Sequence, residues 1–80
     1  MNPRVSTVTA NNNFTLNLIF ANQEQRIFDI KPYLDYPAFA ALNDLDFFLL
    51  AKAEHGTVVW PDNLDFDPDR LFLESIPAKP

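Results

Sequence analysis

The stretch that decides the fold runs from Thr57 to Leu71 and reads TVVWPDNLDFDPDRL. Its β-branched start, residues 57–60, predicts a strand. Residues 61–63, Pro-Asp-Asn, predict a turn because proline and asparagine favour turn conformations. Leu64 and Phe66 then place two apolar side chains on one face of a short strand. The strands at 57–60 and 64–66 and the turn between them are therefore predicted from this stretch alone.

The end of the same stretch predicts a helix. Asp67 stands at an N-cap position and Pro68 in the first helical position, where its missing N–H costs nothing. The helix is expected to run to about Ser75, with Pro77 stopping it. Its buried stripe is expected to comprise Leu71, Phe72, Ser75 and Ile76.

The segment before the stretch, residues 44–54, is open to two interpretations. Leu, Ala, Lys and Glu all favour helix, so a helix through the whole segment is one alternative. However, His55 and Gly56 lie just before the β-branched run, and a two-residue break containing glycine is typical of a hairpin. We therefore expect a short helical turn at about 44–48 and a strand at about 49–54.

The N-terminal half predicts three antiparallel strands in a meander. The strands are expected at 4–10, 14–20 and 26–30, with Asn11, Asn12 and Asn13 forming the first turn. The second strand alternates most clearly, and its core-facing residues are expected to be Phe14, Leu16, Leu18 and Phe20. Pro37 then opens a short helix over 38–42, in which Phe39 and Leu42 share a face.

The composition indicates one folded domain of the α+β class, comprising residues 1–80 with a core at about 3–76 and a tail at 77–80. A hydrophobic fraction of 48% with 21% charged residues and one glycine argues against disorder. The chain has no cysteine, which excludes a disulfide framework, thiolate catalysis and sulfur-ligated zinc. Because so small a core is not covalently stabilised, we also expect a homo-oligomer as one alternative.

Charge and hydropathy restrict location and partners. Eleven acidic against six basic residues give a formal net charge of −5, so nucleic acid is an unfavourable partner and a basic protein a favourable one. The longest apolar runs, 38–42 and 47–51, are far shorter than the ~20 residues that span a bilayer. We find no apolar segment of an export signal at the start and expect a cytoplasmic protein that does not enter a membrane.

Two groups of residues resemble a calcium site and a catalytic site, but each lacks residues that such a site needs. Asp65, Asp67 and Asp69 imitate the start of a calcium loop, but Arg70 and Ile76 occupy positions that require glycine and a bidentate carboxylate. His55 is the only histidine and lies at an expected hairpin tip, without a nucleophile and orienting carboxylate placed beside it by sequence. We predict no catalytic residue, no metal and no cofactor.

Five side chains form the candidate interaction surface: Tyr33, Tyr36, Trp60, Asp62 and Asp65. Amphipathic aromatic residues are enriched at the centres of protein interfaces. For Trp60, packing in the core is the alternative, since tryptophan is largely buried on average. A pocket near Trp60, Tyr33 and Asp65 would suit a small ligand instead.

The order of these signals resembles a bacterial family of small proteins, the domain of unknown function 2442. The resemblance covers residues 3–76 and is most specific at the strand exit 28–34 (FDIKPYL) and at the Trp-Pro cassette, 57–61 with 64–71. Pro3-Arg4-Val5 and Phe14-Thr15-Leu16 also match. Asn22-Gln23 and Asp62-Asn63 replace the more usual Asn-Gly at two turns, so the first hairpin is expected to use a longer loop.

The resemblance implies a compact α+β domain, which in some members is joined to a DNA-binding helix-turn-helix. It also implies that standalone members are often encoded beside another small protein, and it assigns no catalytic residue. Our leading hypothesis is therefore a non-enzymatic protein–protein interaction module, in the manner of an antitoxin or adaptor, whose partner is encoded nearby. The alternative is a small-ligand-binding or regulatory sensing domain.

Overall fold

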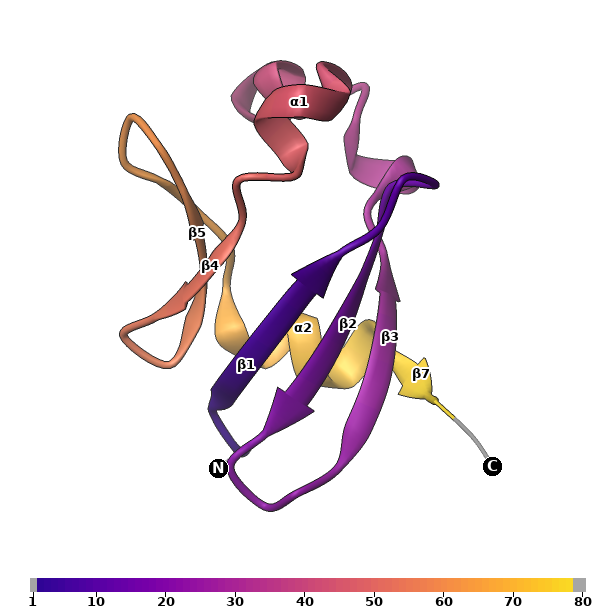
Figure 1. The fold of residues 1–80 in the computed structure, drawn as a ribbon, viewed down its shortest axis with the longest axis vertical. Helices are drawn as coiled ribbons and strands as arrows, with labels where there is room; N and C mark the ends of the chain where they lie inside the picture. Colours follow the sequence, from indigo (N-terminus) through magenta and orange to yellow (C-terminus); the bar gives the residue numbers. More distant parts are fainter. Residues whose placement is uncertain (1, 79–80) are drawn as a thin grey trace.

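A computed structural model describes residues 2–78 and shows an α+β fold with two antiparallel sheets (Figure 1). The elements follow the chain in this order: β1 (Val5–Ala10), β2 (Thr15–Phe20), β3 (Gln25–Asp29), the 3₁₀-helices η1 (Lys31–Tyr33) and η2 (Pro37–Asn43), α1 (Leu45–Phe48), β4 (Lys52–Glu54), β5 (Thr57–Trp60), β6 (Leu64–Asp65), α2 (Pro68–Glu74) and β7 (Ile76–Pro77).

The first sheet has the order β1-β2-β3-β7 and contains the expected meander. The alternation in β2 is confirmed, because Leu16, Leu18 and Phe20 are fully buried. The prediction for Phe14 is only partly right. This residue precedes the strand with a φ of 62°, is half-buried, and packs its ring 5.3 Å from that of Phe48.

A fourth strand, β7, was not predicted. Helix α2 ends at Glu74, and Ile76 pairs with Ile27 of β3 instead of continuing the helix. Ile76 is 62% exposed, so its place in the buried stripe was wrong. Pro77, expected in a tail, also belongs to β7; residues 79 and 80 of that tail lie outside the described part of the chain.

The turn after α2 is held by Arg26, which lies on the inner face of β3. Its Nε donates to the Ser75 hydroxyl at 2.7 Å and its guanidinium to the Ser75 carbonyl at 2.8 Å. The same guanidinium lies 4.7 Å from the centre of the Phe72 ring. These contacts direct the chain out of the helix and along the edge of β3.

The second sheet has the order β4-β5-β6 and is built from two tight hairpins. His55 and Gly56 both have positive φ, 55° and 79°, as do Asp62 and Asn63, 67° and 62°. At the two-residue turn 55–56, positive φ at both central residues is typical of the type I′ turn, whose twist matches that of the flanking strands. The connection between β5 and β6 has three residues, 61–63. The β2–β3 connection uses a four-residue loop, 21–24, as expected from the missing glycine.

The strand expected at 49–54 is shorter than predicted. Backbone N–H groups of Leu49 and Leu50 donate to the carbonyls of Leu45 and Phe47, at 2.9 and 3.0 Å, so the chain is still turning after α1. Extended structure begins only at Lys52. The predicted turn at 44–48 and hairpin at 55–56 are confirmed, with Asp44 capping α1 through the Asp46 N–H at 3.1 Å.

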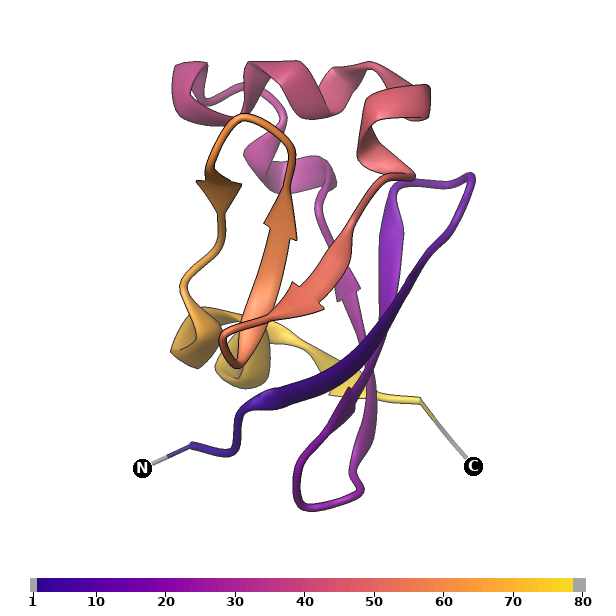
Figure 2. The ribbon, with the colours of Figure 1, turned by 60° about the vertical axis from the view of Figure 1, so that its left-hand side comes forward.

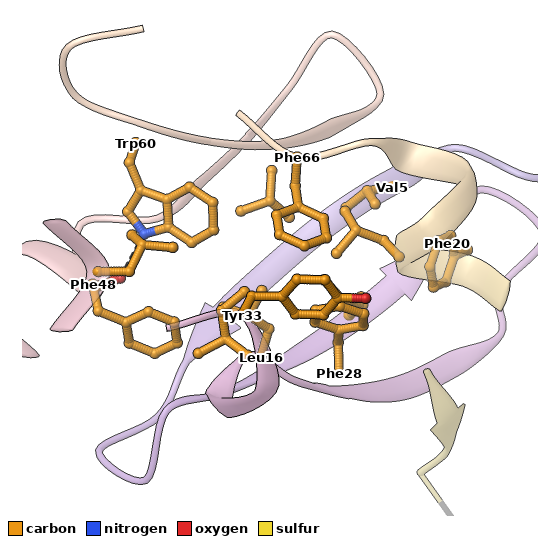
Figure 3. Packing of buried hydrophobic residues seen from close by; sticks show 13 residues of the cluster. Val5, Leu16, Phe20, Phe28, Tyr33, Phe48, Trp60 and Phe66 are labelled. Atoms are coloured by element: carbon orange, nitrogen blue, oxygen red, sulfur yellow. Dashed lines mark hydrogen bonds between the residues drawn. The ribbon is translucent and has the colours of Figure 1, made fainter. Parts of the chain in front are cut away.

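The core lies between the inner face of the first sheet, the second sheet and α2 (Figures 1 and 2). Helix α2 contacts β3 on one side and β5 on the other, while η2 and α1 close the upper end in Figure 2. Aromatic rings fill the centre (Figure 3), where the centroid of the Phe66 ring lies 5.3 Å from that of Phe28 and 5.1 Å from that of Tyr33. One continuous cluster therefore joins both sheets.

Candidate functional site

The outer side of the second sheet is hollowed into a groove of about 510 Å³, which we call the acidic groove. It begins after α1 and is bounded by the two hairpin turns. The groove is lined by Leu50, Lys52, Glu54, His55, Val59, Trp60, Pro61, Asp62, Asn63, Leu64 and Asp65.

The pairing of β5 with its two neighbouring strands shows which side chains form the floor of the acidic groove. Val59 is paired with Lys52 on one side and with Asp65 on the other. Directly opposed residues of antiparallel strands project from the same face, so these three side chains form a row across the sheet. The half-buried Val59 is therefore an apolar floor between a cation and a carboxylate.

The charges of the acidic groove are unbalanced. Glu54, Asp62 and Asp65 are exposed and face a single lysine, Lys52. Within residues 2–78, no carboxylate of the groove has a cationic nitrogen within the 4.0 Å of an ion pair. The groove thus combines an apolar floor with a net negative rim whose carboxylates are free to bind cationic groups.

Trp60 is among the residues that line the acidic groove, but its side chain packs in the core, so it takes the core alternative. Its side chain is only 3% exposed, and its indole Nε1 donates to the Phe48 carbonyl at 2.9 Å. The indole also stacks on the Phe48 ring, with centroids 6.2 Å apart. Trp60 therefore fixes β5 against α1 and presents little surface of its own.

Tyr33 and Tyr36 do not line the acidic groove. Tyr33 is 8% exposed and donates its hydroxyl proton to the Glu74 carboxylate of α2. Burial, followed by this hydrogen bond, raises the pKa of Tyr33 above its ordinary value. The hydrogen bond binds η1 to α2.

Tyr36 is 52% exposed and packs its ring edge-on to that of Tyr33, with centroids 5.7 Å apart. Of the five candidate residues, the structure brings Trp60, Asp62 and Asp65 together at the acidic groove. It places Tyr33 in the core and Tyr36 on the surface beside it.

The remaining side chains with catalytic potential are engaged or exposed. Thr57 donates its hydroxyl proton to the Phe66 carbonyl, and His55 lies exposed at a turn on the rim of the acidic groove. Asp67 accepts from the Asp69 N–H at 3.1 Å, which confirms the predicted N-cap. Residues 2–78 contain no group of three or more His, Asp or Glu that could hold a metal ion.

Several groove residues were missed by sequence reasoning: Leu50, Lys52, Glu54, Val59 and Leu64. A signal for two of them was present, since Lys52 and Glu54 are two apart in an expected strand and must share a face. The pairing of Lys52 with Val59 follows from the two-residue turn that joins their strands. The contribution of Leu50 depends on the end of α1, which sequence did not place.

These features define a small two-sheet α+β domain with an acidic groove on one sheet. In the described part of the chain, no helix is long and apolar enough to cross a membrane. The chain belongs to the family described as protein of unknown function (DUF2442), whose model matches residues 5–77. No curated protein and no solved structure gave a significant match.

Proposed function

We propose that this protein is a non-enzymatic protein–protein interaction module that binds a basic segment of another protein in the acidic groove. The observation that carries the proposal is the free carboxylate rim, formed by Glu54, Asp62 and Asp65 around the apolar Val59. Arginine and lysine side chains satisfy both parts of such a surface, because their stems pack on apolar groups while their charged ends bind carboxylates.

The non-enzymatic part of the proposal is supported by the hydrogen bonds of two buried hydroxyl groups. The Thr57 hydroxyl donates to a backbone carbonyl, and the Tyr33 hydroxyl donates to Glu74 with a raised pKa. A nucleophilic hydroxyl would instead donate its proton to a general base, and a general base would need a pKa near the operating pH. His55 is exposed, without a hydrogen bond to a carboxylate within residues 2–78.

For the partner we propose a protein encoded by a neighbouring gene, bound in the manner of an antitoxin or adaptor. The support is the neighbourhood implied by the family together with the net charge of −5, which accelerates encounter with basic proteins. The compartment we propose is the bacterial cytoplasm, and a chain without cysteine needs no oxidising environment.

Co-expression with the products of adjacent genes, followed by size-exclusion chromatography, tests the proposal. We expect one neighbour to co-migrate with the wild-type protein and to dissociate as salt rises, because added ions screen the carboxylates. The double variant Asp62→Asn/Asp65→Asn should lose the complex. The matched control, Asp35→Asn/Asp46→Asn, changes the net charge equally outside the acidic groove and should retain it. Failure of every neighbour to co-migrate contradicts the proposal.

The acidic groove also supports a second candidate function, a small-ligand-binding or regulatory sensing domain. Its volume of about 510 Å³ falls within the ~300–1,000 Å³ of small-molecule sites. A ligand that binds only the folded state raises the melting temperature, so thermal-shift screening against a metabolite panel distinguishes the two functions. An unchanged melting temperature across the panel counts against this candidate.

A further inference from the structure

Lys52 is the only lysine or arginine among the residues that line the acidic groove. It stands at one end of a row that crosses β4, β5 and β6, with Val59 in the middle and Asp65 at the other end. Two strand spacings of ~4.8 Å place the ends of this row about 10 Å apart. The acidic groove therefore presents a cation at one edge, an apolar floor and a carboxylate at the opposite edge.

The charge of Lys52 is not neutralised by the part of the chain that the structure describes. Within residues 2–78, no carboxylate oxygen lies within 4.0 Å of its ammonium group. Glu54 lies two residues further along the same strand and face, and it does not pair with Lys52 either. Three other cations each have a carboxylate partner: Arg26, Lys31 and Arg70.

A free lysine in the acidic groove is unfavourable for a segment that carries only basic side chains. Asp62 and Asp65 attract such a segment, but Lys52 opposes it with a like charge. Like charges that face one another across an interface lower the affinity and exclude wrong partners. A carboxylate on the partner turns this repulsion into attraction, because it gives Lys52 the ion pair that the chain itself does not supply.

We propose, on the basis of the proposed function, that the partner segment carries an acidic residue that binds Lys52 as well as a basic residue that binds Asp65. An apolar group between them lies over Val59. Charge complementarity selects this segment, since each end of the row then meets the opposite charge. Lys52 is thereby a specificity-determining residue, which admits a segment of mixed charge and disfavours a polybasic one.

The variant Lys52→Gln tests this proposal by calorimetric titration with two probes, the co-migrating neighbour and a hexa-arginine peptide. We expect the variant to bind the neighbour about threefold or more weakly, because it loses the ion pair with the partner's carboxylate. It should bind hexa-arginine about twofold or more tightly, because a like charge has been removed. A merely structural role of Lys52 would weaken both complexes, so the opposite signs identify its role in specificity.

The matched control is Lys31→Gln, which removes one positive charge at a 54% exposed side chain outside the acidic groove. Its Kd for each probe should stay within about twofold of the wild-type value, because salt screens charges that lie far from the bound segment. Far-UV circular dichroism melts verify that both variants are folded.

Charge exchange provides a second test. Lys52→Glu sets a carboxylate against the acidic residue of the partner and should raise the Kd for the neighbour by about tenfold or more. Acidic residues of the neighbour are then replaced by lysine, one at a time. One of these substitutions should restore binding to Lys52→Glu and weaken binding to the wild-type protein.

An unchanged or lower Kd of Lys52→Gln for the neighbour overturns the proposal, because the partner then presents no carboxylate to Lys52. So does the failure of every lysine substitution in the neighbour to restore binding to Lys52→Glu. In both cases the neighbour still binds the wild-type protein, and the proposed function stands. Absence of any binding neighbour overturns the proposed function and this inference with it, and it is seen with the wild-type protein alone.

Discussion

Replacing Trp60 by phenylalanine removes one hydrogen bond and part of one buried ring without introducing a charge. The indole N–H donates to the Phe48 carbonyl at 2.9 Å, in a site where Trp60 is 3% exposed. That carbonyl also accepts from the Ala51 N–H at 3.3 Å, so it is not left wholly unpaired in the variant. The substitution therefore measures how strongly β5 is fixed to α1.

The expected loss follows from these contacts. The hydrogen bond contributes about 1 kcal/mol, because the carbonyl retains its longer partner. The missing part of the ring adds about 1–2 kcal/mol through lost burial and the space left behind. The free energy of unfolding should fall by about 2–3 kcal/mol, from a total of about 4–12 kcal/mol for a domain of this length. The melting temperature should fall by roughly 10–20 °C.

Urea unfolding followed by far-UV circular dichroism measures this loss, since the variant has no tryptophan fluorescence. Tyr36→Phe is the matched control, because this ring is 52% exposed and its hydroxyl makes no hydrogen bond within residues 2–78. The control should remain within about 0.5 kcal/mol of the wild type. A Trp60→Phe variant equally close to the wild type would refute the structural role we assign to the indole.

Three further predictions concern stability. Asp67→Ala should lower the free energy of unfolding in urea by about 1 kcal/mol, because it removes the N-cap of α2. Asp67→Asn should lower it less, and equal losses for the two variants would argue against capping. Gly56→Ala should cost about 1 kcal/mol or more, because φ is +79° and the new Cβ meets the Arg4 side chain at 3.0 Å; an unchanged urea midpoint would contradict this. Burial and Glu74 raise the pKa of Tyr33, so its stabilising effect is complete below pH 10.0 and disappears as pH rises through the folded-state pKa. Tyr33→Phe should therefore flatten the alkaline limb of a stability–pH curve, and an identical alkaline slope would count against the assignment.

Local signals predicted the elements whose geometry is specified by neighbouring residues. The alternation of Leu16, Leu18 and Phe20 identified the central strand, since only one face of β2 is buried. The His55-Gly56 break identified the first tight hairpin, and Asp67 with Pro68 identified the start of α2. In each case the deciding residues are within a few positions of one another.

Features that depend on distant contacts were not predictable in this way. Strand β7 forms because Ile76 finds the edge of β3, 49 residues earlier than itself in the chain, and Arg26 directs the intervening turn. The exposure of Ile76 has the same cause. Leu49 and Leu50 resemble a buried strand in sequence, but the carbonyls of α1 hold them in a helical turn.

The candidate site was predictable to the same limited extent. Asp62 and Asp65 reach the acidic groove because a turn and a strand place them there, and both elements were read from local sequence. Tyr33 lies away from the groove because its hydroxyl binds Glu74, a residue 41 positions later in the chain. Without the position of α2, nothing in the sequence distinguishes a surface tyrosine from a buried one.

The most direct test of the account is calorimetric titration of the co-purifying neighbour into the wild-type protein and into Asp62→Asn/Asp65→Asn. We predict that the double variant keeps the wild-type free energy of unfolding within about 0.5 kcal/mol, because both side chains are exposed. Its Kd for the neighbour should rise by about tenfold or more, and the difference should shrink as salt is added. Equal affinity of the two proteins would contradict the acidic groove as the binding site.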